Sequence, residues 1–127
     1  MQLVTIKRRA DFLRVRGGAR ATNVSFVLEA KARDETVKPA VEPPAPRFGF
    51  TVTKKIGNSV VRNRIKRRLR EAVRHSASAY CRPEFDYVVI ARGAALARAF
   101  ADLKGDLVTA LQRVHAKDQA RRPPAQD

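Results

Sequence analysis

Hydrophobic residues recur with helical or strand periods along most of this 127-residue chain. Residues 5–16 carry apolar side chains at helical spacing and stop at a Gly-Gly pair, which predicts a short helix. Residues 23–28 are rich in β-branched and aromatic side chains, which favours a strand. In residues 48–53 large apolar side chains alternate with smaller or polar ones, and this period of two predicts a second strand with one buried face.

The period becomes helical again from residue 60 to about residue 79. Gly57-Asn58-Ser59 precedes this stretch and offers an N-cap. Apolar residues placed at 100° intervals gather on one stripe, namely Val61, Ile65, Leu69, Ala72 and Val73. The opposite side collects Asn63, Lys66, Arg67, Arg70 and Arg74, flanked by Arg62, Arg64 and Arg68. We therefore expect a helix that is anchored by one face and strongly basic on the other.

The remaining chain adds a strand, a helix and two irregular segments. Residues 85–91 form a run of strand formers whose continuous apolar centre predicts a central strand covered on both faces. Leucine, phenylalanine and valine recur every three or four residues over 96–114, which predicts a helix. The Pro-rich segment 30–46 is expected to be a long mobile loop, and 116–127 a frayed, flexible tail. The pattern predicts one domain over residues 1–115, of the α+β or the α/β class.

Charge narrows the possible partners. The chain has 27 Lys and Arg against 12 Asp and Glu, so its formal net charge is +15. Its apolar content is that of a globular domain, and it has neither an apolar run long enough to span a membrane nor the apolar core of a secretory signal. The single cysteine, Cys81, excludes an internal disulfide and fits a reducing cytoplasm. The expected partner is a polyanion, most simply a nucleic acid, and we do not expect the protein to bind a membrane.

Two short stretches carry most of this charge. Residues 54–74 hold nine basic residues against Glu71 alone, a net of +8, and residues 7–20 hold six against Asp11, a net of +5. A solvated helix face usually interleaves Glu with its basic residues at i, i+4, and only Glu71 does so here. The basic helix therefore indicates a phosphate-binding surface rather than a merely solubilising one.

The stretch T-V-T-K-K-I-G-N-S-V-V-R-N-R-I-K-R-R-L-R-E, residues 51–71, resembles the signature of the bacterial ribonuclease P protein family. Its centre is the family's "RNR" region, Arg62-Asn63-Arg64. Weaker similarity covers most of the chain: Asp11-Phe12 with Gly17, the strand around residues 25–28, and residues 86–92. Only the Pro-rich loop and the C-terminal tail fall outside the resemblance.

The resemblance implies a fold, partners and an activity. The family fold is a two-layer α+β domain of order α-β-β-β-α-β-α, with a mixed central sheet and an unusual left-handed β-α-β crossover. The family's protein assists a catalytic RNA, the RNase P RNA, in removing the 5′ leader of precursor tRNA. That RNA and the substrate hold the Mg²⁺ ions, so the protein is part of an endoribonuclease without being catalytic alone. No protein partner is required.

Residue roles follow from the same resemblance. Contacts to the catalytic RNA are expected from Lys54, Lys55, Arg62, Asn63, Arg64, Lys66, Arg67 and Arg70. The leader is expected to meet Phe12, Arg16 and Lys55, with Phe12 as the surface on which nucleotides lie. The family often has further aromatic residues where this chain has Arg16 and Glu29, so its leader cleft is expected to rely less on stacking and more on charge.

Other chemistry is weakly supported. A structural ribosomal or nucleoid-type binder is the alternative function, and the scarcity of carboxylates in the basic region argues against a self-sufficient nuclease. His75 and Cys81 are too few for a zinc site, and His115 stands alone, so structural roles are expected for all three. Asp86 and Glu84, at the start of a strand, are interpreted as turn or strand-edge residues. Phe50 could face either side of its strand.

Overall fold

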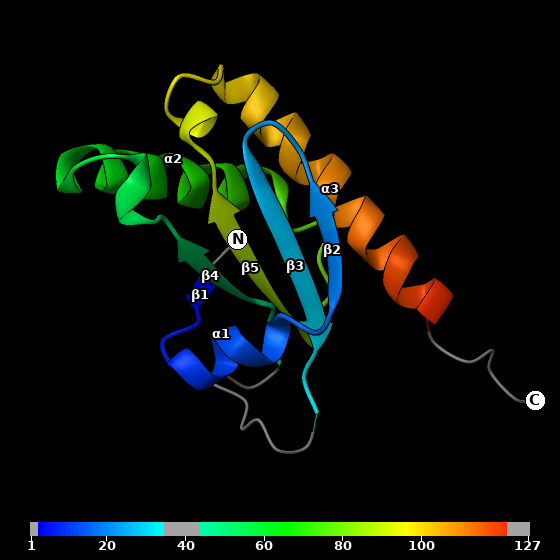
Figure 1. Cartoon of the computed structure of the whole chain (residues 1–127). Coiled ribbons are helices and arrows are strands. Elements are labelled where there is room, and N and C mark those ends of the chain that lie inside the picture. Colours follow the sequence, from blue (N-terminus) through cyan, green and yellow to red (C-terminus); the bar gives the residue numbers. More distant parts are fainter. Residues whose placement is uncertain (1–2, 35–43, 122–127) are drawn as a thin grey trace, which may run out of the picture.

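The structure is a computed structural model that describes residues 3–34 and 44–121. Within them, the strands form one mixed five-stranded sheet of order β1-β4-β5-β3-β2 (Figure 1). The strands are β1 (Val4–Thr5), β2 (Ala19–Thr22), β3 (Phe26–Ala32), β4 (Arg47–Thr51) and β5 (Phe85–Ala91). β5 pairs in parallel with β4 and antiparallel with β3, so the most apolar strand is central, as predicted.

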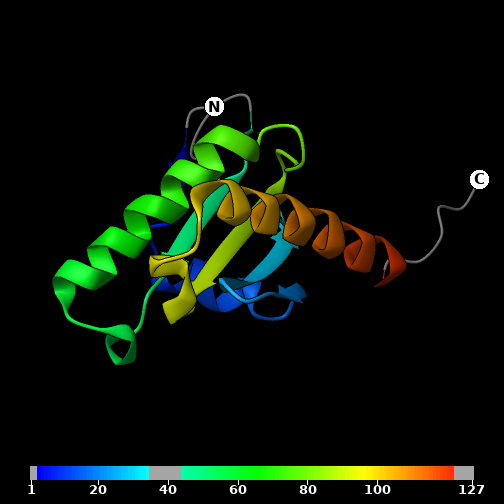
Figure 2. The ribbon, with the colours of Figure 1, turned by 90° about the horizontal axis from the view of Figure 1, so that it is seen from above.

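Helices cover the two faces of the sheet unequally. The helical elements are α1 (Arg9–Val15), α2 (Ser59–Ser76) and α3 (Phe100–Arg121), with short 3₁₀ turns η1 (Lys54–Ile56) and η2 (Gly93–Leu96). α2 and α3 lie side by side and enclose the main core with one face of the sheet (Figure 2). α1 packs on the other face, where Val15 contacts Val88 and Ile6.

Alternation along the strands sorts side chains between these two faces. Phe85, Tyr87 and Val89 of β5 belong to the core under α2 and α3, whereas Val88 and Ile90 face α1. This is the arrangement expected of a strand covered on both sides. The α+β class is confirmed, and from α1 onward the element order is α-β-β-β-α-β-α, with α2 crossing between the parallel neighbours β4 and β5.

The predicted N-terminal helix begins too early. Residues 4–5 pair with β4 instead of coiling, and the amide of Ile6 donates to the carbonyl of Phe48 at 2.9 Å. The helix therefore starts only at Arg9. Helical spacing of apolar residues could not reveal this, because β1 depends on a partner strand more than 40 residues away.

The predicted strand over residues 23–28 is shifted, and one strand was missed. The side chain of Asn23 accepts from the amides of Ser25 and Phe26, both at 2.9 Å, and turns the chain before β3 begins. The missed strand β2 has the sequence A-R-A-T, whose small buried alanines give little strand signal. β3 extends to Ala32, so residues 30–32 are strand and not loop; residues 35–43 of the Pro-rich segment lie outside the described residues.

The ends of the two long helices also differ from the prediction. Asn58 caps α2 as expected, its side chain accepting from the amide of Val61 at 3.0 Å. α2 ends at Ser76, three residues early. α3 begins at Phe100 and continues to Arg121, so residues 116–121 are helical where fraying was predicted, and residues 122–127 lie outside the described residues.

Candidate RNA-binding surfaces

α2 presents a basic hollow opposite its buried stripe. Ile65, Leu69, Ala72 and Val73 are buried against the sheet and α3, which fixes the direction of the other face. That face contains a hollow of about 410 Å³, which we call the RNR face. It is lined by Asn63, Lys66, Arg67, Arg70, Glu71 and Arg74.

The RNR face holds cations that the protein itself does not neutralise. Its one lining carboxylate, Glu71, pairs with Arg74 at 2.7 Å and lies 3.5 Å from His75. In the described part of the chain, Lys66, Arg67 and Arg70 have no carboxylate within ion-pairing distance. Like charges one helical turn apart repel each other, so this surface is suited to a polyanion.

The other residues predicted to contact RNA surround this hollow without lining it. Lys54 and Lys55 are exposed on η1, between the end of β4 and the start of α2. Arg64 is exposed and Arg62 half-buried on the first turns of α2. All eight predicted residues therefore lie on two consecutive elements, η1 and α2. Only four of them line the hollow.

Arg68 has a structural role within the same basic run. Its Nε donates to the carbonyl of Ala95 at 3.1 Å, and Nη2 donates to the carbonyl of Arg98. Ala95 belongs to η2, and Arg98 lies in the turn between η2 and α3. Arg68 thus joins α2 to the start of α3 and is not directed at a ligand.

A second basic hollow lies beside α1, on the other face of the sheet. It measures about 340 Å³, and we call it the α1 groove. It is lined by Lys7, Arg9, Phe12, Leu13, Arg16 and Thr51. Three of these side chains are cationic and none is acidic, while Phe12 and the 42 % exposed Leu13 add an apolar floor. Such a combination suits single-stranded nucleic acid, which offers both phosphates and bases.

The predicted leader contacts are only partly brought together. Phe12 and Arg16 line the α1 groove, and the Phe12 ring is half-buried against the Ile6, Val15 and Val88 cluster. Lys55 lies beyond the end of β4, outside the groove lining.

The structure also shows where Glu29 and Phe50 lie relative to the α1 groove. Glu29 is 5 % exposed on β3, paired across the sheet with Arg20 and Val88, so the sheet face near α1 carries a carboxylate at that position. Phe50 packs against the main core on the α2 side and is not in the groove.

Sequence reasoning missed the ionic cluster beneath α1. Asp86, interpreted as a turn or strand-edge residue, is fully buried and accepts from three arginines. Arg14 of α1 approaches it at 2.5 Å, Arg33 at 2.8 Å and Arg47 of β4 at 2.6 and 2.8 Å. Arg47 also lies 3.6 Å from Asp11. The one available signal was a charged residue inside the apolar run F-D-Y-V-V-I-A.

This cluster fixes the charge of Asp86. Burial alone would raise its pKa, but the hydrogen bonds from Arg47 and Arg33 outweigh burial, and the pKa lies below the ordinary value. The hydrogen bond to Asp86 likewise raises the pKa of Arg47. Arg14 therefore ties α1 to the sheet through a carboxylate that stays ionised.

The histidine and cysteine side chains have structural positions. His115 is buried with its ring edge against Phe85 and its Nε2 at 2.6 Å from the Tyr87 hydroxyl. Burial raises the pKa of the half-buried Cys81 thiol, which disfavours the reactive thiolate. Among residues 3–34 and 44–121, no three His, Cys, Asp or Glu side chains gather into a group able to hold a metal ion. Nor is any helix in those ranges both long and apolar enough to cross a membrane.

Comparison with known proteins gives a consistent result. The model of the Ribonuclease P family matches residues 2–115. The ribonuclease P protein component of Brucella suis is 42 % identical over 121 residues, covering 94 % of this chain and 84 % of the relative. That of Paramagnetospirillum magneticum is 42 % identical over 127 residues, covering 99 % and 93 %.

Solved structures agree with the sequence relatives. The RNase P protein of Staphylococcus aureus aligns with a TM-score of 0.68 at 30 % identity, covering 92 % of this chain and 98 % of that one. The RNase P protein of Thermotoga maritima aligns with the same TM-score at 26 % identity, covering 87 % and 96 %. With a family match over nearly the whole folded region and relatives of this length, the chain belongs to the bacterial ribonuclease P protein family and is a component of the ribonuclease P holoenzyme.

Proposed function

We propose that this chain binds two RNA elements with two separate surfaces: the RNase P RNA with the RNR face and η1, and the 5′ leader of precursor tRNA with the α1 groove. The observation that carries the proposal is the α1 groove itself. It combines three cations and no carboxylate with a half-buried aromatic ring, on the sheet face opposite α2. A protein that bound one duplex nonspecifically would need only one such surface.

The RNR face and its surroundings would hold the RNA subunit through phosphates. Lys54, Lys55, Arg62, Arg64, Lys66, Arg67 and Arg70 supply the charge, and Asn63 can donate and accept hydrogen bonds at a base or sugar edge. Each phosphate contact releases counterions, so affinity should fall steeply with salt. Arg70 is also held within the protein by a cation–π contact, since its guanidinium lies over the Phe50 ring, 5.9 Å from the ring centroid.

The α1 groove would hold the leader as a single strand. Phe12 offers a ring face to a nucleotide, while Lys7, Arg9 and Arg16 neutralise phosphates on either side. Lys55, beyond the carboxyl end of β4, would meet RNA between the two surfaces. The family resemblance implies aromatic residues at the positions of Arg16 and Glu29, and charge is therefore expected to supply a larger share of leader affinity here.

In this proposal the protein positions RNA and does not carry out the cleavage. The Mg²⁺ ions that support hydrolysis of the phosphodiester belong to the RNA subunit and the substrate. The chain's own contribution is to neutralise phosphates that would otherwise repel one another where substrate and catalytic RNA meet. Cys81, the only cysteine, forms no internal disulfide, in keeping with a cytoplasmic location.

The test is a reconstitution with purified RNase P RNA at low Mg²⁺. Cleavage of precursor tRNA only when both protein and RNA are present supports the proposal. Cleavage by the protein alone, or no effect of the protein, contradicts it. Arg16→Ala should weaken binding of leader-containing tRNA more than of mature tRNA, with Arg113→Ala on the exposed side of α3 as the matched control. An equal loss for both substrates would refute the assignment of the leader to the α1 groove.

A further inference from the structure

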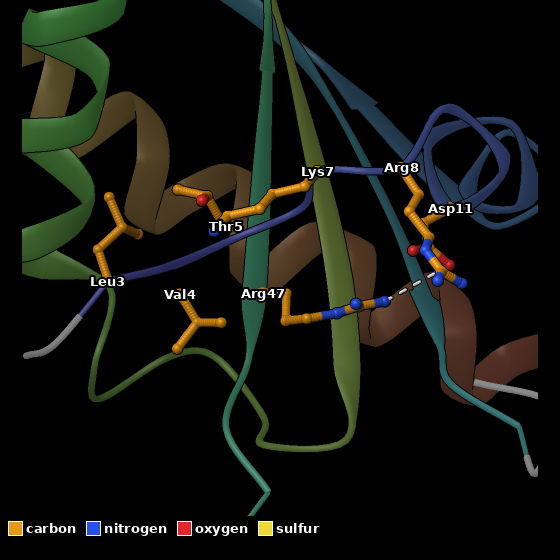
Figure 3. A pocket seen from close by; sticks show the side chains of 7 residues that line it. All are labelled: Leu3, Val4, Thr5, Lys7, Arg8, Asp11 and Arg47. Carbon is orange, nitrogen blue, oxygen red and sulfur yellow. Dashed lines mark ion pairs between the residues drawn. The ribbon is translucent and has the colours of Figure 1, made fainter. Parts of the chain in front are cut away.

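A third hollow lies at the beginning of α1, between that helix and the edge strand β1. It measures about 400 Å³, and we call it the N-terminal pocket (Figure 3). It is lined by Leu3, Val4, Thr5, Lys7, Arg8, Asp11 and Arg47. Neither the RNR face nor the α1 groove includes Arg8 or Arg47, so the pocket is a separate feature.

The lining of this pocket carries more positive than negative charge. Lys7 and Arg8 are exposed, and within the described residues neither has a carboxylate at ion-pairing distance. Arg47 extends into the pocket from β4 and is 8 % exposed. Asp11 is the one acidic residue of the lining. It forms an ion pair with Arg47, drawn in Figure 3, in which Oδ1 of Asp11 lies 3.6 Å from Nη2 of Arg47. Three cations thus face one carboxylate that is already engaged.

The cluster behind the pocket increases this imbalance. Arg47 shares the buried Asp86 carboxylate with Arg14 and Arg33, so three guanidinium groups compete for two oxygen atoms. Their side chains are only 9–15 % exposed, and water screens them poorly. Together with Lys7 and Arg8, these arginines make five cations, and the described ion pairs and pocket lining give them two carboxylates, Asp11 and Asp86. Partly buried positive charge of this kind is stabilised when an external anion joins it.

The position of the N-terminal pocket beside the α1 groove indicates which anion it would bind. Lys7 lines both the N-terminal pocket and the α1 groove, so the two hollows meet at the turn that leads into α1. An RNA strand lying in the groove and continuing past Lys7 would bring its next phosphate to Arg8 and Arg47. Val4, whose side chain points away from that of Leu3 in Figure 3, adds an apolar surface to the lining against which the attached sugar or base can pack.

We propose that the N-terminal pocket is a phosphodiester subsite, in which Arg8 and Arg47 bind a leader phosphate beyond the nucleotides held in the α1 groove. This inference rests on the proposed function of the groove. Arg8 is the specific contact, because its side chain is exposed and forms no ion pair among residues 3–34 and 44–121. Arg47 sets the charge at the base of the pocket and is held in place by Asp86.

The experiment measures the affinity of the reconstituted holoenzyme for precursor tRNAs whose leaders lengthen one nucleotide at a time. The variants are Arg8→Gln in the pocket, Arg16→Ala in the groove and Arg113→Gln as a control of equal charge loss on α3. Arg8→Gln should bind short leaders like the wild type and lose about fivefold for leaders long enough to reach the pocket. The slope of log affinity against log salt should decrease by about 0.7 for those leaders alone.

Three results would overturn the inference. One is an Arg8→Gln variant that matches the wild type at every leader length. The second is an equal loss for all leaders, mature tRNA included. The third is weaker binding of the RNase P RNA without substrate, which would assign the phosphate to the catalytic RNA. Arg16→Ala is measured in parallel to separate the two proposals. If only Arg16→Ala loses affinity for leader-containing tRNA, the phosphate subsite in the N-terminal pocket is rejected. If neither variant loses affinity, the proposed function of the α1 groove is rejected.

Discussion

The ring of Phe12 on α1 lies directly on the backbone of Gly49 on β4, where a Cβ atom would come within 2.6 Å of the ring's Cζ. Only glycine at position 49 leaves room for the Phe12 ring so close to the backbone of β4. Phe12 is consequently half-buried: its inner side packs on the sheet, and it still lines the α1 groove. The aromatic floor of the groove therefore depends on a missing side chain on another element.

Gly49→Ala should lift the Phe12 ring from the sheet. The added methyl group overpacks the contact, so we expect a loss of roughly 1–3 kcal/mol in the free energy of unfolding, measured with urea. Leader-containing tRNA should lose affinity while RNase P RNA binding is retained. Gly105→Ala is the control, because no atom lies within 4 Å of its Cβ position and an exposed helical Gly→Ala change should stabilise by about 1 kcal/mol. Equal stability of the two variants would show that Phe12 does not rest on Gly49.

Local patterns sufficed for features that a short stretch of sequence determines by its own spacing of apolar residues. The apolar stripe of α2 and its Asn58 cap are set within a few residues, and both were predicted. The continuous apolar centre of β5 likewise indicated a central strand. Lys66, Arg67 and Arg70 could be placed on the face opposite that stripe for the same reason, since helical period alone determines on which side of α2 they lie.

Features that depend on distant partners could not be predicted. Arg14 and Asp86 are 72 residues apart, and although Asp86 stands inside an apolar run, nothing in the sequence near Arg14 indicates that it pairs with this carboxylate. The basic run around Arg68 shows the same difficulty, because this one arginine among several donates to the carbonyls of Ala95 and Arg98, which precede α3. Arg47, in turn, follows the Pro-rich segment, where no periodicity indicated a strand start.

Asp86→Asn should unfold the protein more easily, because three partly buried guanidinium groups would lose their shared counter-charge. The expected cost is about 3–5 kcal/mol in the free energy of unfolding, measured with urea at neutral pH. Asp102→Asn, at an exposed position on α3, serves as the control and should change stability by no more than about 0.5 kcal/mol. Near-equal stability of the two variants would mean that the arginines do not depend on Asp86.

The same carboxylate predicts how stability responds to acid. Its pKa is below the ordinary value of 3.8 in the folded protein, so the unfolded chain binds a proton at Asp86 more readily than the folded protein does. The contribution of Asp86 is therefore complete above the ordinary pKa and is lost as pH falls through the folded one. Urea unfolding at several pH values between about 5 and 2 should show a steeper loss for the wild type than for Asp86→Asn. Parallel curves would contradict the lowered pKa.

Neighbouring arginines on α2 should separate stability from RNA binding. Arg68→Ala removes two hydrogen bonds to the carbonyls of Ala95 and Arg98, and we expect a lower melting temperature and a loss of about 1–3 kcal/mol. Arg67→Ala removes an exposed cation that forms no ion pair with any described residue, so stability should change by no more than about 0.5 kcal/mol.

RNA binding should show the reverse order. Arg67→Ala should weaken RNase P RNA binding and reduce the slope of log affinity against log salt by about 0.7–0.9, the share of one phosphate contact. Arg68→Ala, measured well below its melting temperature, should keep the wild-type slope. Both predictions are checked by titrating the RNA at several KCl concentrations and by thermal unfolding of the same preparations. If Arg68→Ala lowered the slope and left the melting temperature unchanged, Arg68 would be an RNA ligand and not a link between α2 and α3.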